Sequence, residues 1–142
     1  MGTRKGDLTP LKHALSLLED IKTFVRKMAY NLNFHQQALL NRLTLGYCQD
    51  IQDERDEGNT RYYAHVFCRP FTICCSDDLF ECPNDIQVGI LLHEIGHLMS
   101  QSCLDKDADL WVFDQLNIVI AYTPNASALQ YIEAEDLERI TG

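Results

Sequence analysis

Long apolar runs are missing from this chain of 142 residues: none approaches the length of about 18 residues that a membrane-spanning helix needs. Basic residues are also scarce, since 12 Lys and Arg stand against 21 Asp and Glu, and the formal net charge is −9. Nucleic acids and anionic membranes are bound by basic surfaces, so the composition argues against both as partners. The first residues have no apolar core behind them, and the sequence therefore predicts no signal peptide at this start.

The six cysteines include no C-x-x-C pair, and this absence argues against a separate thiolate zinc site. Their spacing fits disulfides in an exported protein and buried thiols in a cytosolic protein almost equally, with a slight preference for export. Disulfides are not required for stability, because a chain of this size with 46% hydrophobic residues can bury a sufficient core.

A helical pattern extends over the N-terminal part of the chain, residues 9–48. Apolar residues recur at steps of three and four over 11–25, and Thr9 is a candidate N-cap for this helix. A second helix is expected over about 34–45, before a glycine. The sequence therefore predicts two helices and no strand in this part.

Residues 61–75 change to strand-forming types, and Pro70 interrupts the run. Proline within such a pattern is typical of an edge strand or of a break between two short strands. An exposed edge matters because a peptide can pair with it as an additional strand. Residues 77–84 form a turn-rich connection to a helix that we expect to start near 83–85.

The motif H-E-x-x-H occurs as His93, Glu94 and His97 inside a helical apolar pattern. Positions four apart lie on one face of a helix, so both imidazoles can direct a ring nitrogen at one zinc ion. Glu94 lies off that axis, where it can serve as the general base toward a water molecule. Gly96 in mid-helix indicates close approach of a neighbouring segment. The buried stripe on the opposite side would be Leu91, Ile95, Leu98 and Met99.

A catalytic zinc ion keeps three protein ligands, and no histidine follows His97 in the sequence. The metzincin continuation is excluded, because Ser100 and Cys103 occupy the positions of its glycine and its last histidine. The third ligand must therefore come from another residue type, and aspartates follow directly.

Three aspartates, Asp105, Asp107 and Asp109, are the candidates for the third ligand. On a helix over 104–119, Asp105 lies closest to the apolar face, and we prefer it as the ligand. Ser102 and Asp105 also have the spacing of a capping box. Asp109 lies one turn further along, where it could accept a hydrogen bond from a ligand imidazole.

Residues 71–80, 90–97 and 125–133 resemble the aspzincins, the group of deuterolysin and lysine-specific metalloendopeptidases, whose third zinc ligand is an aspartate. The three segments are similar to that family's strand and aromatic turn, its zinc motif and its closing segment. The family's G-T-x-D-x-x-Y-G pattern is absent. Residues 105–109 are also similar to the E-x-x-x-D helix of the gluzincins, with aspartate in place of the ligand glutamate. Both resemblances imply Asp105 as the ligand.

These features predict a compact, zincin-like α+β domain over residues 1–142, with the catalytic part in 61–142 and an edge strand beside the active-site helix. We expect a zinc endopeptidase with about one zinc ion per chain. A metal-activated water would attack the peptide bond, with Glu94 as the base and the hydroxyl of Tyr122 or Tyr131 near the oxyanion. The predicted metal ligands are His93, His97 and Asp105.

The alternative is a zinc-containing binding or toxin-like module that keeps the fold without proteolysis. As an enzyme, the protein is expected to be a monomer that acts on a protein or peptide substrate. Basic residues near the scissile bond are favoured by the charge of −9 and by the basic-substrate habit of the aspzincins that the chain resembles.

Overall fold

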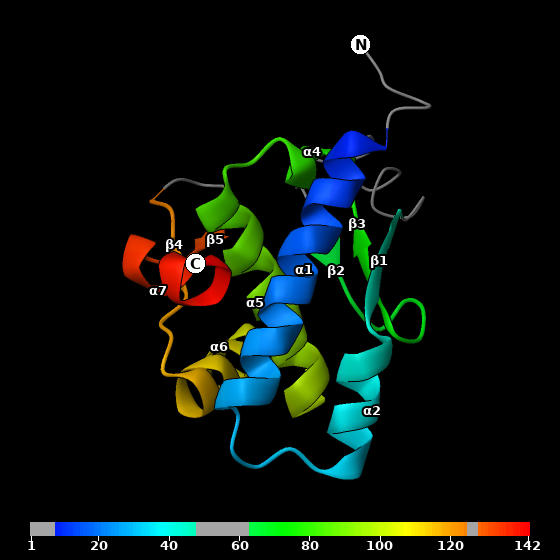
Figure 1. Cartoon of the computed structure of the whole chain (residues 1–142), viewed down its shortest axis with the longest axis vertical. Helices are drawn as coiled ribbons and strands as arrows, with labels where there is room; N and C mark the ends of the chain where they lie inside the picture. The colour runs from blue at the N-terminus through cyan, green and yellow to red at the C-terminus, as the bar shows by residue number, and fades with distance from the viewer. Residues whose placement is uncertain (1–7, 48–62, 125–127) are drawn as a thin grey trace.

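Helix α5 runs through the middle of the molecule, between a three-stranded sheet on one side and β4, β5 and α7 on the other (Figure 1). The computed structural model describes residues 8–47, 63–124 and 128–142. The predicted α+β class with a small sheet is confirmed. The helices are α1 Thr9–Met28, α2 Phe34–Arg42, α4 Asp77–Phe80, α5 Asn84–Ser100, α6 Asp105–Leu116 and α7 Ala134–Thr141. The strands are β1 Thr44–Tyr47, β2 Ala64–His65, β3 Thr72–Cys75, β4 Ala121–Tyr122 and β5 Gln130–Tyr131.

The larger sheet has the order β1-β3-β2, with β1 parallel and β2 antiparallel to β3. Strands β1 and β2 are therefore the two edges of this sheet, and β2 packs beside α5, as predicted for an edge strand next to the motif helix. Pro70 lies in the turn that separates β2 from β3, so the run over 61–75 contains two short strands. Two aromatic residues of this turn, Phe67 and Phe71, have positive φ angles of 72° and 57°.

The predicted helix over 34–45 is wrong at its end, because α2 stops at Arg42 and Leu45 lies in β1. Pairing with β3 and burial of the Leu45 side chain outweigh the local helical pattern. Thr9 is the first residue of α1 rather than its N-cap, a position that Leu8 takes without a side-chain hydrogen bond. Residues 77–80, expected as part of a turn-rich connection, form the short helix α4.

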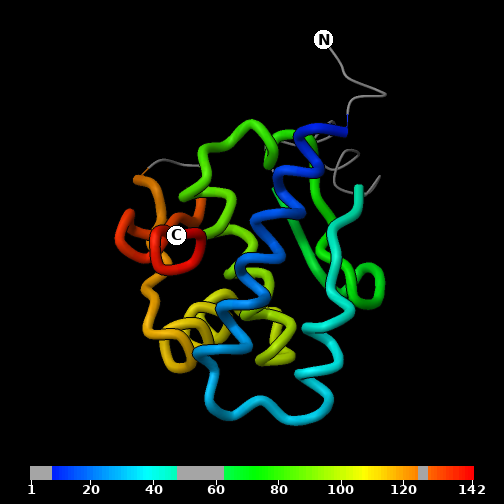
Figure 2. Tube along the Cα trace, in the orientation of Figure 1, coloured from blue at the N-terminus to red at the C-terminus, as the bar shows by residue number. Residues whose placement is uncertain are grey.

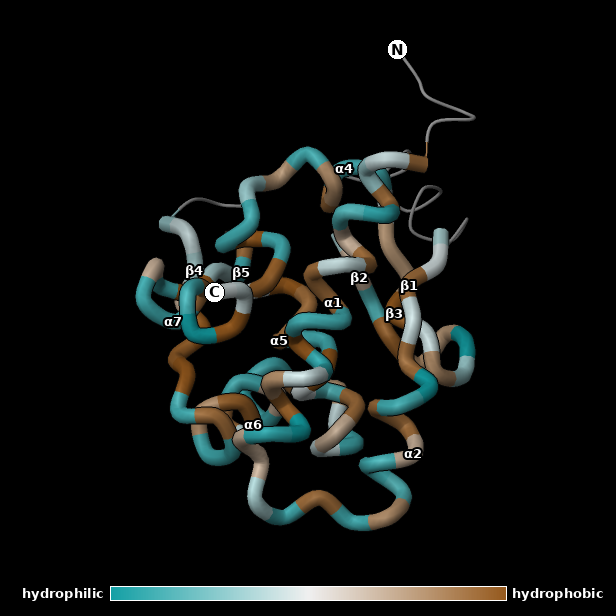
Figure 3. Tube along the Cα trace, in the orientation of Figure 1, coloured by the Kyte–Doolittle hydropathy of each residue, from teal (hydrophilic) through white to brown (hydrophobic). Residues whose placement is uncertain are grey.

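The side chains of α5 are buried around the whole helix over residues 87–99. The predicted stripe of Leu91, Ile95, Leu98 and Met99 is buried as expected, but burial is not confined to that side of the helix. Helix α5 has neighbours on all sides, namely α1, α6, α7, β2 and β5, and these supply the burial. Figure 3 shows the hydrophobic stretches of the trace gathered in the interior around α5. The two motif histidines are consequently held inside the protein.

The C-terminal helix α7 returns to α1 and α5 and closes the side of the core opposite the sheet (Figure 2). Its Ile140 side chain is buried, and Arg139 lies over the ring of Phe24 of α1. Within the described ranges, no helix has both the length and the apolar composition that crossing a bilayer requires.

Gly96 brings the backbones of α5 and α6 into contact, which confirms the close approach expected from a mid-helix glycine. A Cβ atom at this position would lie 2.9 Å from the carbonyl carbon of Ala108 in α6. Gly89, which lies earlier in α5, has the same role toward β5. A Cβ atom at this position would lie 2.7 Å from the backbone nitrogen of Tyr131. These contacts determine how closely α5 packs against α6 and β5.

We expect Gly96→Ala to lower the free energy of unfolding by about 1–3 kcal/mol. Alanine favours a helix over glycine by about 1 kcal/mol, but its methyl group would overlap backbone atoms of Ala108 that cannot move without displacing α6. Urea denaturation measures the change. Gly46→Ala is the control, because its nearest neighbour is the flexible end of the Arg69 side chain. Equal stability of the two variants would contradict the close packing of α5 on α6.

Candidate metal centre

The side chains of His93, His97 and Asp105 converge at the junction of α5 and α6. The Nε2 atoms of His93 and His97 are 3.1 Å apart. The Oδ1 atom of Asp105 lies 3.1 Å from Nε2 of His93 and 3.2 Å from Nε2 of His97. Both histidines are buried, whereas the Asp105 side chain is 72% exposed and reaches the group from its solvent side. The structure thus brings together the three predicted ligands.

The hydrogen bonds of the two Nδ1 atoms determine which ring nitrogen of each histidine carries a proton. Nδ1 of His93 lies 2.7 Å from Oδ1 of Asp109, and Nδ1 of His97 lies 2.8 Å from the carbonyl oxygen of Ser102. A carbonyl oxygen and a carboxylate accept hydrogen bonds, so both Nδ1 atoms donate their protons to these partners. With its proton on Nδ1, a neutral imidazole presents a lone pair on Nε2. The two Nε2 atoms and the Asp105 oxygen then form a set of three electron-pair donors that could hold a metal ion.

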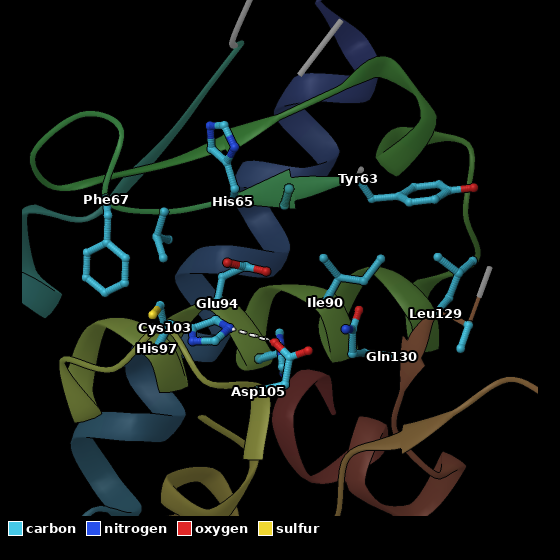
Figure 4. Close-up of a pocket in the computed structure, with 14 residues that line it drawn as sticks. Tyr63, His65, Phe67, Ile90, Glu94, His97, Cys103, Asp105, Leu129 and Gln130 are labelled. Atoms are coloured by element: carbon cyan, nitrogen blue, oxygen red, sulfur yellow. Dashed lines mark hydrogen bonds and ion pairs between the residues drawn. The ribbon is translucent and has the colours of Figure 1, made fainter. Parts of the chain in front are cut away.

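Glu94 is buried beside this set and is 8% exposed. Figure 4 shows its carboxylate directed into the cleft between α5 and β2. Burial raises the pKa of Glu94 to about 8; His93 opposes this shift and Asp105 adds to it. A cation at the three donors would lower that pKa and favour the carboxylate form. Glu94, His93 and His97 form one of the groups whose ligand atoms lie close enough to share a metal ion.

Asp109 links His93 to Tyr122 through its two carboxylate oxygens. Oδ1 faces His93, and Oδ2 accepts a hydrogen bond of 2.6 Å from the Tyr122 hydroxyl. Burial lowers the pKa of His93, but the hydrogen bond to Asp109 and the charges of the neighbouring carboxylates outweigh this effect, so the pKa is raised. Asp109 thus has the position predicted for an acid that orients a ligand imidazole.

Tyr122 and Tyr131, the two tyrosines predicted near an oxyanion, lie in different surroundings. Burial and the hydrogen bond to Asp109 raise the pKa of Tyr122, and its proton points to Asp109. Tyr131 lies in β5 with its backbone against Gly89, and its neighbour Gln130 lines the cleft instead. The structure therefore brings Tyr122 into the surroundings of His93 and leaves Tyr131 out of the cleft lining.

Ser102 has a role that the sequence did not reveal. Its carbonyl orients His97, and its hydroxyl donates a hydrogen bond of 2.6 Å to Asp107 and accepts one from the backbone nitrogen of Leu104. The predicted capping box with Asp105 is wrong, because Ser102 binds Asp107 instead and Leu104 is the N-cap of α6. The carboxylate of Asp107 is therefore held by Ser102. The signal available in the sequence was a serine shortly before the aspartates of α6.

We expect Asp109→Ala to weaken metal binding by about 10- to 100-fold, since it removes the hydrogen bond that orients His93. Tyr122→Phe should have a smaller effect in the same direction, because it removes only the support of Asp109. Competition with a chromophoric chelator measures both changes. Asp114→Ala is the matched control on the exposed side of α6. An affinity loss in Asp114→Ala as large as in Asp109→Ala would contradict an orienting role.

A cleft of about 400 Å³ lies between β2 and α5, with the three donors and Glu94 in its wall. Figure 4 shows Phe67 close to Cys103 and His97, while Tyr63 and Leu129 lie at the other end of the view. The edge of β2 borders the cleft along its length, and residues 128–130 contribute to the wall. Residues 125–127 of the segment that resembles the aspzincins lie outside the described residues. The cleft is therefore bordered by the edge strand β2, by α5 and by residues 128–130.

Comparison of the chain with protein-family models, with curated proteins and with solved structures gives no match in any of the three.

Proposed function

We propose that this protein is a zinc-dependent endopeptidase. The observation that carries the proposal is the convergence of two imidazole nitrogens and a carboxylate oxygen at 3.1–3.2 Å from one another, with Glu94 beside them in a cleft. An H-E-x-x-H helix with this arrangement is typical of zinc peptidases. The resemblance to aspzincins and gluzincins in sequence supports the same reading.

The donor set fits zinc better than a hard cation. Ligand atoms around tetrahedral zinc, at about 2.0–2.1 Å from the metal, are separated by about 3.3 Å, close to the distances among the three donors. Magnesium and calcium prefer sites made only of oxygens, whereas imidazole suits zinc. His93, His97 and Asp105 would hold the ion, and the exposed side of Asp105 leaves access from the cleft. When bound, zinc polarises the scissile carbonyl and increases the acidity of water.

The chain's own residues would perform the remaining steps. Glu94 takes a proton from the attacking water and passes it to the leaving amine, because its carboxylate faces the cleft directly beside the ligands. Asp109 and the Ser102 carbonyl hold the imidazoles in the orientation that the ion needs. The edge of β2 pairs with an extended substrate and places its peptide bond over Glu94.

The substrate would be a protein or peptide segment that can extend along β2. The net charge of −9 favours basic substrates, and Asp105 is the one member of the aspartate cluster 105–109 that lines the cleft. The lining of the cleft also includes the apolar side chains of Ile90 in α5 and of Leu129. We therefore propose a substrate that combines an apolar side chain with a Lys or Arg near the scissile bond.

A peptide library tests the function. The metal-free protein should be inactive, reconstitution with zinc should restore cleavage, and an excess of chelator should abolish it, because the ion is needed for the attack on the carbonyl. Mass spectrometry of the products locates the cut and the residues around it. Zinc binding without cleavage of the library, of casein or of other unfolded proteins would contradict the peptidase and favour the binding-module alternative.

A further inference from the structure

His65, Cys68 and Cys74 form a second group of metal-binding side chains. One ligand atom from each lies within 4.8 Å of the others. His65 belongs to β2, Cys68 to the turn after it and Cys74 to β3. The group is therefore built from the strand pair that borders the cleft, and its donors differ from those of the first group in being mainly sulfur.

The pairing of β2 with β3 explains how these residues meet. His65 is the direct partner of Cys74 in the antiparallel register, so their side chains lie on the same face of the sheet. The turn then returns Cys68 to this pair. It does so with Phe67 and Phe71 at positive φ, a conformation that is uncommon for bulky residues and needs support from the surroundings. A metal ion bound at Cys68 would provide such support, because it would tie the turn to both strands.

The donor chemistry selects a soft or borderline ion. Two thiolates and one imidazole are ligands of zinc and are poor ligands for magnesium or calcium. Two thiolates neutralise the charge of Zn²⁺, and each thiol releases its proton as the zinc–sulfur bond forms. The guanidinium of Arg69 lies beside Gly46, the β1 partner of Cys74.

The two groups lie on different sides of β2. In Figure 4 the ring of His65 points from β2 away from Glu94 and α5, whereas the donors of the first group come from below the cleft. Cys74 is fully buried and Cys68 is exposed. We propose that His65, Cys68 and Cys74 bind a second Zn²⁺ ion, which fixes the turn behind the substrate-binding edge.

Cobalt substitution of the full chain tests this proposal without reference to peptidase activity. The reduced, metal-free protein is titrated with Co²⁺ and then with Zn²⁺. We expect about two metal ions per chain and a thiolate-to-cobalt charge-transfer band in the near ultraviolet, which His93, His97 and Asp105 cannot produce because they supply no sulfur. His93→Ala combined with His97→Ala should remove one ion and leave the band unchanged.

Cys68→Ser should remove the band and the other ion, and His65→Asn should weaken both. Cys68 is exposed, so its substitution leaves the core intact, and circular dichroism checks the fold. Cys103→Ser is the matched control, because Cys103 is an exposed thiol in the lining of the first cleft. A band that persists in Cys68→Ser, a band lost in Cys103→Ser, or uptake of a single ion by the reduced wild-type chain would overturn the second site. A Cys68–Cys74 disulfide that survives reduction would overturn it as well.

Discussion

Glu94→Gln should give a folded, zinc-loaded protein whose peptidase activity is lower by roughly 100-fold or more, the usual contribution of a general base. Glutamine keeps the shape of the buried side chain but cannot take a proton from water. It also removes a carboxylate whose pKa burial raises to about 8, so the substitution should not destabilise the metal-free protein. Turnover of a fluorogenic peptide and zinc content are measured on the same preparation.

Glu135→Gln makes the same chemical change on the outer side of α7 and serves as the control. Its activity should equal that of the wild type. If Glu94→Gln retained near-normal turnover with zinc bound, the carboxylate would have another role. The proposed mechanism would then be wrong, although the protein would still bind zinc.

Asp105→Ala should weaken zinc binding at the first site by more than the roughly 100-fold upper limit expected for Asp109→Ala. The reason is that Asp105 supplies a ligand atom, whereas Asp109 only accepts a hydrogen bond from the ligand His93. His93→Ala and His97→Ala should release most of the ion for the same reason. Isothermal titration in the Cys68→Ser background confines the measurement to the first site. Loss of the Asp105 oxygen leaves the two imidazoles with an incomplete set of ligands.

Asp107→Ala is the comparison within the same helix turn. Its carboxylate accepts a hydrogen bond from Ser102, whereas Asp105 and Asp109 contact the histidines, so its effect should be the smallest of the three aspartates. A larger loss in Asp107→Ala than in Asp105→Ala would show that the α5–α6 junction binds metal in an arrangement other than the one described.

The core of the site could be predicted because it depends on local geometry. The spacing of His93 and His97 within one helix fixes their relation, and the helical phase of residues 105–109 placed Asp105 and Asp109 correctly. The direction of Tyr122 could not be predicted, because it depends on how β4 returns to α6 across the fold.

Long-range packing caused the remaining errors. Leu45 lies in a strand because β3 is available as a partner, and no local pattern contains that information. Likewise α5 is buried on every side because distant elements surround it. The group at His65 could not be predicted from the sequence, because its members meet through strand register, whereas a C-x-x-C pattern contains only neighbours along the chain.

The α5–α6 junction places the three donors of the first site within 12 residues of one another along the chain, as the His93–Asp105 separation shows. Contacts of such short range close small loops and form early, before distant strands find their partners. The cleft wall, by contrast, is complete only when residues 63–67 and 128–130, which are distant in the sequence, lie beside α5. The proposed metal centre can therefore form before the cleft is complete during folding. Substitutions in the cleft wall can then change which peptide would be bound without removing the metal ligands.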